Sequence, residues 1–321
     1  MAQFRFSEID VAIVDDTQMS VTTTRSLLRD LGMREFTIIE NIDKSRDHLA
    51  SKQFDLLVMN SHLQDIEIAP LVHDIRQGDL GLDPFVPVIS LAWEPSLDLI
   101  QQLCGVGVDV ILTLPLTIDK ISHALELLIQ RRRPFVVTAD YIGPDRRNSV
   151  RTGLSGAPTT SVPNRLKRKA VGKDDAPPHE LVVSDINDYR VESYISRITF
   201  SVGKISGLTS SGGEGTMRDW IEQLRISASN LSRRIDGTRY SHQSALCRSL
   251  MDVTDNLVAE ASPTAADMEL LQQIALALEI TIKQEDATTL RSAHSLAQNL
   301  APDSPPDSTL NIGQAHAESL G

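Results

Sequence analysis

The sequence predicts an α/β fold: a doubly wound, five-stranded parallel sheet followed by a basic linker and a helical C-terminal region. Three observations support this prediction. Short apolar runs alternate with amphipathic stretches five times within residues 8–131, which is the pattern of consecutive βα units. Gly, Pro, Ser, Thr and basic residues dominate residues 143–178, a composition typical of linkers. Apolar residues then recur at helical spacing from about residue 216 to residue 301.

Each expected strand is a short apolar run, as in a parallel sheet that is buried on both faces. The strands are expected at Val11–Val14, Phe36–Ile39, Leu56–Met59, Val86–Leu91 and Val110–Leu112. The helices between and after them are expected at Ser20–Leu31, Asp43–Ser51, Ile66–Arg76, Ser96–Cys104 and Ile118–Arg131. Because a helix follows every strand, we expect right-handed crossovers with helices on both faces of the sheet.

The composition divides the chain into five parts. Residues 8–131 are expected to form the α/β domain, and residues 132–180 a basic linker without regular structure. Residues 181–215 stay ambiguous, because their apolar positions follow a helical period while their β-branched content favours strands. Residues 216–301 are expected to be helical, with apolar stripes that suit a bundle or a dimerising hairpin. Residues 302–321 open with PDSPPDS and are expected to be a disordered tail.

Charge and cysteine content narrow the class of protein. The 321 residues carry a net charge of −12, yet residues 131–173 hold eleven Lys or Arg against two Asp, so the remainder carries −21. The two cysteines, Cys104 and Cys247, lack metal-ligand spacing and favour a reducing compartment. No apolar stretch has the length of a membrane helix, and the N-terminus lacks a signal-peptide pattern. We therefore expect a cytoplasmic protein with no membrane insertion.

Several landmarks follow the expected strands in order. VAIVDDTQMS places Asp15 and Asp16 at the carboxyl end of the first strand, and FDLLVMN ends the third strand on Asn60. VPVISLAW forms the fourth strand, and VILTLPL carries the fifth strand into Leu114-Pro115. With these motifs, residues 8–131 resemble the receiver (CheY-like) domain of two-component response regulators. In that family an acidic pair and an acceptor Asp gather Mg²⁺, and the acceptor takes a phosphoryl group.

Compared position by position, this sequence has the acidic pair of the family but not its acceptor Asp, its Thr or Ser, or its Lys. Asp15 and Asp16 match the pair, but the acceptor position is Asn60, the Thr or Ser that reads the phosphate is Ala92, and the Lys before Pro115 is Leu114. An amide offers no anionic oxygen to phosphorus, and neither apolar side chain binds a phosphate. The resemblance therefore implies a pseudo-receiver: a protein that is not an enzyme, with no phosphate expected on Asn60.

Two interpretations of the acidic pair stay open. Asp15 and Asp16 are either a remnant that caps the first helix or a weak Mg²⁺ site; beyond that, no cofactor is expected. Without phosphorylation, the resemblance implies a signalling adaptor in a bacterial-type two-component or phosphorelay context. Its protein partner is expected on the face built from the fourth helix, fifth strand and fifth helix, where Trp93 is a candidate contact and an equally good candidate for simple packing.

The basic segment is a second candidate site. Its cations are Arg146, Arg147, Arg151, Arg165, Lys167, Arg168 and Lys169. Clustered guanidinium groups suit phosphate recognition, so the alternative function is binding of a cyclic dinucleotide or nucleic acid. DRRNSVR resembles the arginine stretch that opens PilZ domains, which bind cyclic di-GMP, although the Asp-x-Ser-x-x-Gly element that should follow is missing. The competing interpretation is a solvated linker that neutralises the acidic domains.

One motif in the helical region suggests a third function, phosphotransfer through a histidine. In EDATTLRSAHSLAQNLA, Ala293, His294 and Leu296 resemble the histidine helix of phosphotransfer domains. Ala297 and Gln298 replace the Lys and Gly of that motif, and a Pro-rich tail replaces the two helices that should follow. The competing interpretation is an exposed histidine beside an apolar stripe.

Overall fold

The computed structural model of the chain describes residues 4–64, 66–147, 159–173, 176–209, 214–260 and 264–280. Its N-terminal part contains a five-stranded parallel sheet in the order β2-β1-β3-β6-β7. The strands are β1 (Asp10–Val14), β2 (Glu35–Ile39), β3 (Leu56–Asn60), β6 (Val88–Ala92) and β7 (Val110–Thr113). This is the doubly wound order of flavodoxin and CheY, and it confirms the expected fold class.

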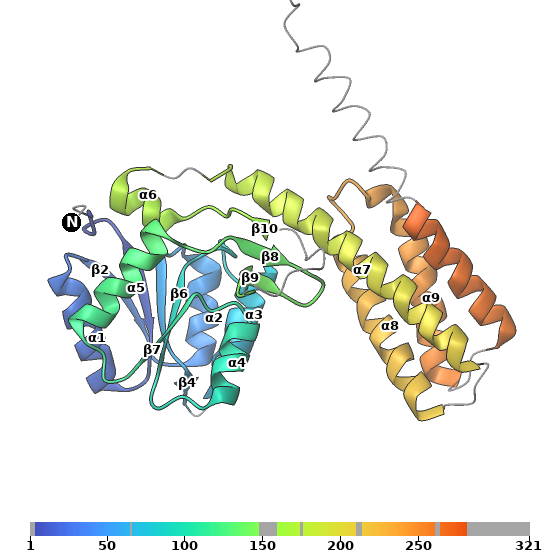
Figure 1. Cartoon of the computed structure of the whole chain (residues 1–321), viewed down its shortest axis with the longest axis horizontal. Helices are drawn as coiled ribbons and strands as arrows, with labels where there is room; N and C mark the ends of the chain where they lie inside the picture. The colour runs from blue at the N-terminus through green and yellow to red at the C-terminus, as the bar shows by residue number, and fades with distance from the viewer. Residues whose placement is uncertain are drawn as a thin grey trace, which may run out of the picture.

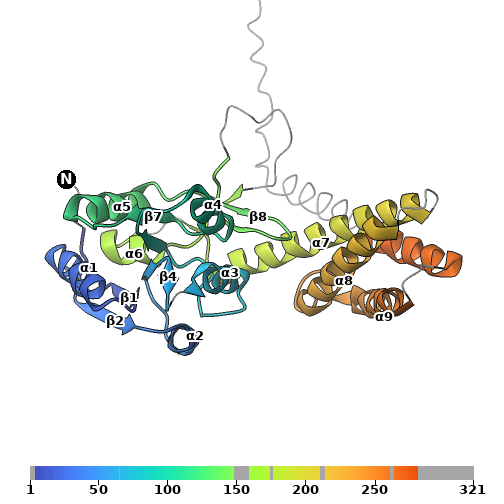
Figure 2. The ribbon, with the colours of Figure 1, turned by 90° about the horizontal axis from the view of Figure 1, so that it is seen from below.

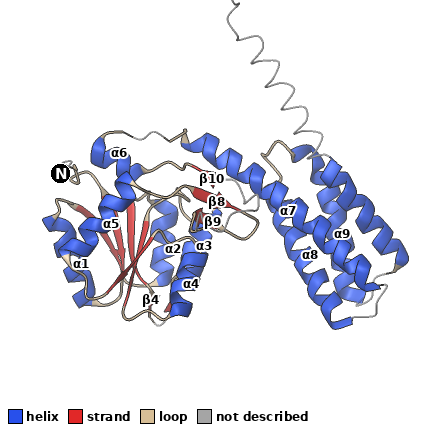
Figure 3. Ribbon diagram, viewed as in Figure 1, coloured by secondary structure: helices blue, strands red, loops and turns tan. Residues whose placement is uncertain are grey.

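Helices cover both faces of the sheet (Figures 1 and 3). They are α1 (Gln18–Asp30), α2 (Ile42–Ser51), α3 (Ala69–Gln77), α4 (Leu97–Gly105) and α5 (Ile118–Gln130). One apolar core joins α1 and α5 to the sheet, and a second core joins α2, α3 and α4 to the opposite face. Side chains of Asn41, Ser96 and Thr117 cap the first turns of α2, α4 and α5, which explains where these helices begin.

A short hairpin interrupts the third βα unit. The strands β4 (His62–Leu63) and β5 (Ile66–Glu67) pair antiparallel between β3 and α3. The expected helix from Ile66 therefore begins later, at Ala69, with Pro70 in its first turn. Proline fits that position because its missing N–H has no partner in the first turn of a helix.

The segment expected to be a linker folds over the amino edge of the sheet, so the prediction of irregular structure for residues 132–180 is wrong in its described part. It forms β8 (Phe135–Val137), β9 (Ile142–Pro144), β10 (Thr159–Thr160) and the helix α6 (Arg165–Val171). The strands make a small antiparallel sheet in the order β10-β8-β9. Leu166 and Ala170 of α6 are buried in the core that α1 and α5 share, so apolar burial holds this segment in place.

The small sheet meets the domain through a close backbone approach. A Cβ atom on Gly143 of β9 would lie 2.7 Å from the Cα of Gly107, and one on Gly107 would lie 2.6 Å from the carbonyl oxygen of Ile142. Gly107 also has φ +90°, a conformation that favours glycine. Beside this contact, the buried side chain of Arg76 donates to the carbonyl of Gly107 at 2.9 Å. The hairpin β8–β9 is thus packed onto the loop between α4 and β7.

The C-terminal region is helical, as expected, and residues 181–215 belong to it where they are described. Its elements are α7 (His179–Thr209), α8 (Glu214–Arg234), the 3-10 turn η2 (Ser241–Gln243) and α9 (Ser244–Glu260), followed by a helix over residues 265–280. These helices share one apolar core. Figure 2 shows α7 leading from the sheet domain into the bundle that it forms with α8 and α9. Within the described residues, no helix combines the length and apolar character that crossing a membrane requires.

Two arginines tie the bundle to the sheet domain. Arg190 of α7 is buried and donates to the backbone carbonyl of Gln77 at 2.9 Å and to the side-chain oxygen of the same residue. Arg234 of α8 donates to the Gln77 carbonyl at 3.2 Å and to Asp79. Gln77 ends α3, so the cations meet the negative end of that helix dipole. At the same joint, Val182 and Ile186 of α7 pack against the small sheet.

Candidate functional site

The candidate site lies at the carboxyl edge of the parallel sheet, where open α/β sheets bind their ligands. Asp15 follows β1 directly, and Asn60 ends β3. These strands are neighbours, with Val14 opposite Met59, so the next residues, Asp15 and Asn60, are also side by side. Their side chains touch: Nδ2 of Asn60 donates a hydrogen bond of 3.1 Å to Oδ1 of Asp15.

Asp15 is buried with one satisfied and one unsatisfied oxygen. Its side chain is 1% exposed, and Oδ1 also accepts the backbone N–H of Thr17 at 2.9 Å. Thr17 is the N-cap residue of α1, so Asp15 orders the entry to that helix without being its cap. Oδ2 of Asp15 is buried and makes no hydrogen bond within the described residues. A buried carboxylate with one bare oxygen is costly unless something compensates it.

Asp16 serves a different contact. Its Oδ2 accepts the backbone N–H of Gln64 at 2.8 Å, and its side chain is exposed. Gln64 belongs to the turn of the β4–β5 hairpin and has φ 53°, in the left-handed region that is uncommon for residues other than glycine. Asp16 therefore anchors the hairpin that follows Asn60, and the acidic pair organises local backbone around the site.

Ala92 and Leu114 occupy the two positions whose side chains would bind the phosphate in a receiver, and both have apolar surroundings in the structure. Ala92 ends β6 and is fully buried, and its carbonyl accepts the N–H of Leu114 at 2.9 Å. The side chain of Leu114 packs against the core beneath α1 and α5. The peptide bond from Leu114 to Pro115 is cis. Neither side chain offers a charge or a donor to an anion, so these two positions, like Asn60, lack the groups that act on a phosphoryl group in receivers.

A magnesium ion fits these residues poorly. Mg²⁺ prefers octahedral oxygen ligands, with carboxylates supplying most of the charge. The bare Oδ2 of Asp15 is one such oxygen, but Asn60 presents an N–H donor to the other oxygen of the same carboxylate. Among the described residues, no group of three or more His, Cys, Asp or Glu side chains is placed to hold a metal. The N-cap residue of α1 is Thr17, and neither aspartate takes that place, so the capping interpretation does not hold in that form. The weak Mg²⁺ site stays a prediction.

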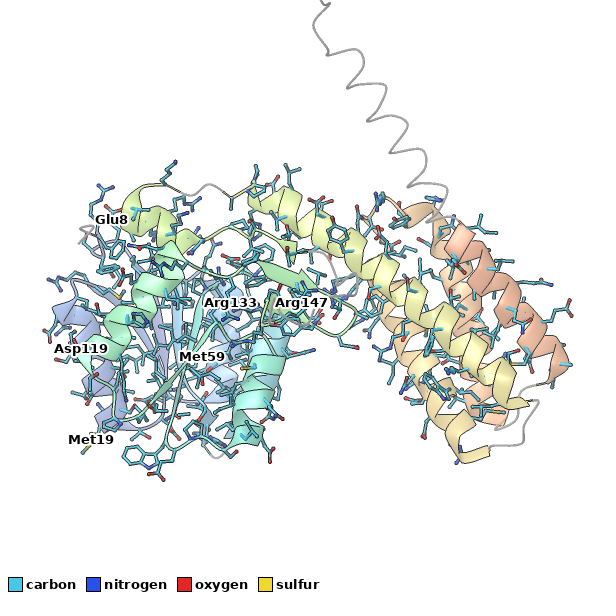
Figure 4. The ribbon with its side chains drawn as sticks, viewed as in Figure 1. Glu8, Met19, Met59, Asp119, Arg133 and Arg147 are labelled. Carbon is cyan, nitrogen blue, oxygen red and sulfur yellow. The ribbon has the colours of Figure 1, made fainter. Side chains whose placement is uncertain are left out.

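Large apolar side chains surround this edge and are open to solvent. Met19 at the start of α1 is 81% exposed, Trp93 directly after β6 is 67% exposed, and Leu97 at the start of α4 is 69% exposed. Ile66 of the hairpin and Ile118 at the start of α5 are also exposed. All five follow the carboxyl ends of parallel strands, and Figure 4 shows Met19 at the end of the domain away from Glu8. We call these five side chains the apolar rim. The sequence pattern singled out Trp93 and missed the other four.

The predicted anion-binding cations have mostly intramolecular partners. Nε of Arg165 and Nζ of Lys169 bind opposite oxygens of the fully buried Asp55, at 3.1 and 2.6 Å. Arg146 donates to the backbone carbonyl of Val108, and Arg147 pairs with Asp145 at 2.9 Å. This pairing lowers the pKa of the Asp145 carboxyl, mainly through the hydrogen bonds that Arg147 donates.

The remaining cations of that set are placed differently. Lys167 and Arg168 belong to α6; Arg168 is exposed, and Lys167 is partly exposed beside a cleft. Arg151 and His294 lie outside the described residues, so anion binding by Arg151 and phosphotransfer by His294 stay predictions. The described cations of this set therefore have separate partners: Asp55 for Arg165 and Lys169, Val108 for Arg146, and Asp145 for Arg147.

The solved structures that are similar to this chain include receiver domains. The receiver domain of sensor histidine kinase PA1611 from Pseudomonas aeruginosa PAO1, with a magnesium ion in its active site cleft, is 18% identical; the match covers 37% of this chain and 94% of that chain, with a TM-score of 0.33. A CheY-like receiver domain protein from Methanospirillum hungatei JF-1 is 19% identical, covering 37% and 92%, with a TM-score of 0.34. The receiver domain of an HD domain-containing protein from Pseudomonas fluorescens Pf-5 is 23% identical, covering 38% and 93%, with a TM-score of 0.33.

No protein-family model and no curated protein matches the chain. The expected resemblance to receiver domains is confirmed at the level of fold for the N-terminal part, where the strand order is that of CheY. Fold alone does not fix function, so the activity has to be argued from the carboxyl edge itself.

Proposed function

We propose that this chain is a signalling adaptor of the response-regulator type, which docks a protein partner through the apolar rim and needs no phosphorylation to do so. In this proposal the chain is not an enzyme. The observation that carries the proposal is the apolar rim itself: five large apolar side chains stand exposed around a site that has no nucleophile. Exposed large apolar side chains that share one end of a folded domain are typical of an interaction surface.

The hydrogen bond from Asn60 to Asp15 supports the constitutive part of the proposal. An acceptor carboxylate beside Asp15 would place two negative groups together, and a cation would then be needed to hold them. The amide of Asn60 supplies a donor in that place. In this proposal the hydrogen bond holds the edge in one arrangement, and the rim around it stays exposed without a covalent signal.

The proposed partner surface differs from the one that the resemblance implies. The resemblance implies the face of α4, β7 and α5, and the apolar rim shares with it Leu97 and Ile118, the first residues of α4 and α5. A partner that covers the rim would bury the indole of Trp93, which is 67% exposed. Buried aromatic side chains commonly contribute about 2 kcal/mol or more to such interfaces.

Phosphorylation is tested by intact-mass measurement after incubation with acetyl phosphate and Mg²⁺. We expect no phosphoryl adduct on the wild-type chain. An adduct on the wild-type chain would refute the phosphorylation-independent mechanism. The Asn60→Asp variant run in parallel tells whether the pocket still assembles: an adduct on the variant alone means that the site is silenced at its nucleophile.

Docking is tested by affinity capture with quantitative mass spectrometry from cells that express the chain. The double variant Trp93→Ala with Leu97→Ala is expected to retain its specific protein partner at least about tenfold less than wild type. Leu82→Ala is the matched control, because Leu82 is also exposed but lies before β6, toward the amino edge. A partner that is captured equally by the double variant, or that needs acetyl phosphate for capture, would contradict the proposal.

A further inference from the structure

Each side chain of the apolar rim has a carboxylate close to it in the chain. In the order of the rim residues Met19, Ile66, Trp93, Leu97 and Ile118, these carboxylates belong to Asp16, Glu67, Glu94, Asp98 and Asp119. Asp16 lies three residues before Met19, and each of the others directly follows its apolar neighbour. All except the partly buried Glu67 are exposed. We call these five the rim carboxylates.

The loops that carry the rim are held in defined conformations. The side-chain amide of Gln102 on α4 donates to the carboxylate of Glu67, which ties the β4–β5 hairpin to that helix. Directly after Trp93, Glu94 has φ 44°, in the left-handed region that is uncommon for residues other than glycine. Such conformations cost free energy and gather at functional sites. The turn at Glu94 leaves the indole of Trp93 in solvent.

The structure supplies the rim carboxylates with no cation. Among the described residues, none of the five forms an ion pair with Lys or Arg. Nζ of Lys120 donates to the carbonyl oxygens of Thr113 and Pro115, at 2.8 and 3.1 Å. Five carboxylates and this one ammonium leave four negative charges at the rim. Beyond the rim, at the start of α2, the charges of Asp43 and Lys44 offset each other.

Helix dipoles account for only part of this pattern. Asp98 and Asp119 lie in the first turns of α4 and α5, where the dipole stabilises a negative charge. Asp16, Glu67 and Glu94 lie outside the helices, so the stability of a helix does not explain them. An exposed apolar surface edged with carboxylates matches a partner that brings cations beside its own apolar groups.

The charge and the shape of the rim disfavour other occupants. A second copy of the chain docked rim to rim would bring like charges together, which is unfavourable. The negative surface of an anionic membrane would be repelled in the same way. A partner strand needs an unpaired strand edge, and the described strands at the rim, β4 and β5, have two residues each. An amphipathic helix needs only exposed apolar groups for its apolar face.

We propose that the partner presents to the apolar rim an amphipathic helix whose apolar stripe is flanked by Lys and Arg. This inference rests on the proposed adaptor function, because it specifies the chemistry of the partner at the same surface. The stripe covers the exposed apolar side chains, and the flanking cations meet the rim carboxylates. Arg offers a carboxylate two parallel donors, and complementary charges also speed association and select the partner.

The test titrates the full chain with two synthetic helical peptides that share one Leu stripe and contain no Trp. One peptide has Lys and Arg beside the stripe, and the other has Glu. The chain has two Trp residues, so in the Trp220→Phe variant a blue shift of the fluorescence reports burial of Trp93. We expect a saturable shift with the basic peptide, weakened when NaCl is raised from about 50 to about 300 mM. The Glu peptide is expected not to bind below about 1 mM.

Removing charge from the rim is expected to weaken binding of the basic peptide. Glu94→Gln with Asp98→Asn removes two carboxylates and no apolar group, so we expect the affinity to fall about threefold to tenfold. Glu8→Gln with Glu35→Gln is the matched control: both residues are exposed, Glu8 precedes β1 and Glu35 begins β2, at the amino edge. This control removes the same charge and is expected to bind within about twofold of wild type.

Two further measurements exclude effects of the substitutions on folding. Circular dichroism melts check that each variant is folded, and isothermal titration of the wild-type chain repeats the peptide comparison without Trp220→Phe. The inference is overturned if the two peptides bind alike, if neither saturates below about 1 mM, or if the amino-edge control weakens binding as much as the rim variant does.

Affinity capture from cells separates this inference from the adaptor proposal. If Trp93→Ala with Leu97→Ala loses the partner while Glu94→Gln with Asp98→Asn captures it at the wild-type level, docking stands and the inference about its charge fails. If both double variants capture the partner like wild type, the adaptor proposal fails as well. Loss of the partner in both, with unchanged capture by the amino-edge control, supports both.

Discussion

Nδ2 of Asn60 lies 3.1 Å from Oδ1 of Asp15, and this contact joins the ends of two neighbouring strands, β1 and β3. The amide is a donor where a receiver of the family would have an acceptor carboxylate. Asp15 is 1% exposed, and the amide hydrogen is one of two donors to the same oxygen. The contact therefore joins the two strand ends through a hydrogen bond.

Replacing Asn60 with Asp is expected to destabilise the domain and to make its stability depend on Mg²⁺. The variant loses the donor to Asp15 and sets two carboxylates side by side, which costs about 1–3 kcal/mol. A divalent cation relieves the repulsion by binding both groups and the bare Oδ2. Urea unfolding without Mg²⁺ and with Mg²⁺ at about 10 mM measures both effects, because that concentration exceeds the dissociation constants of weak cation sites.

Asn41→Asp is the control for that experiment. Asn41 caps α2 through a hydrogen bond from the Lys44 N–H, and Asp caps a helix as well as Asn does. This control adds the same charge but is expected to show neither the loss of stability nor the Mg²⁺ response. If Asn60→Asp unfolds like wild type in the absence of Mg²⁺, the Asn60–Asp15 hydrogen bond contributes little.

Replacing Asp55 with Asn is expected to loosen α6. The buried carboxylate of Asp55 holds Arg165 and Lys169 and accepts the N–H of Asp10 at 2.8 Å. An uncharged amide cannot pair with both cations, so we expect the free energy of unfolding to fall by about 2–4 kcal/mol. This is less than for a fully buried ion pair, because both cations are partly exposed. Limited proteolysis is expected to cut the variant within or beside α6, where wild type resists.

Asp74→Asn tests whether any lost ion pair has this effect. Asp74 pairs with Arg46 at 2.8 Å, and the two side chains are 30% and 46% exposed. Exposed pairs contribute less than about 1 kcal/mol, so this control should unfold close to wild type and keep α6 protected. Equal proteolysis of both variants would contradict the role assigned to Asp55.

The α/β domain was predictable because its signal is local. Buried parallel strands such as Leu56–Met59 are continuous apolar runs, and the helices between them have one apolar face. Topology then placed Asp15 beside Asn60, since the carboxyl ends of neighbouring parallel strands share one edge. The hairpin at residues 62–67 was missed because two-residue strands leave no periodic pattern.

The basic segment was mispredicted because its order depends on distant partners. Composition alone makes residues 132–180 resemble a linker, whereas Arg165 and Lys169 meet Asp55 across more than 100 residues of chain. The apolar rim was missed for a related reason: periodicity marks Leu97 or Ile118 as apolar, but it does not tell whether the fold buries them. Both features are properties of tertiary structure.

Replacing Gly143 with Ala is expected to displace the small sheet from the domain. The added methyl group would lie 2.7 Å from the Cα of Gly107 and from the hydroxyl of Tyr141, and backbone cannot retreat without moving β9. Overpacking of this kind costs about 1–3 kcal/mol, measured as a fall in the urea midpoint with an unchanged slope.

Gly203→Ala is the matched control for that variant. Gly203 lies within α7, and nothing is within 4 Å of a Cβ added there. Alanine in an exposed helix interior is expected to stabilise by about 0.5–1 kcal/mol. The opposite signs of the two substitutions distinguish a close approach from a general effect of removing glycine, and a stabilising Gly143→Ala would refute the contact.

The contact between His179 and Asp83 is expected to make stability depend on pH. His179 begins α7, and its Nε2 lies 3.6 Å from the carboxylate of Asp83. The interaction with Asp83 raises the pKa of His179 above its ordinary value of 6.5, with a smaller contribution from Glu180, while burial and Arg165 act in the opposite direction. The imidazole ring also packs against Phe85.

Because the pKa is higher in the folded chain, the contribution is complete below pH 6.5 and is lost as pH rises through the raised pKa. The side chain is 39% exposed, so solvent screening limits the effect to about 0.5 kcal/mol. Urea unfolding at a series of pH values from 5.5 to 8.5, roughly bracketing the titration of histidine, measures it. His179→Gln should remove this part of the pH dependence, while His123→Gln, on the exposed face of α5, should leave it unchanged. If the two variants have the same slope, Asp83 does not hold the start of α7 through this charge.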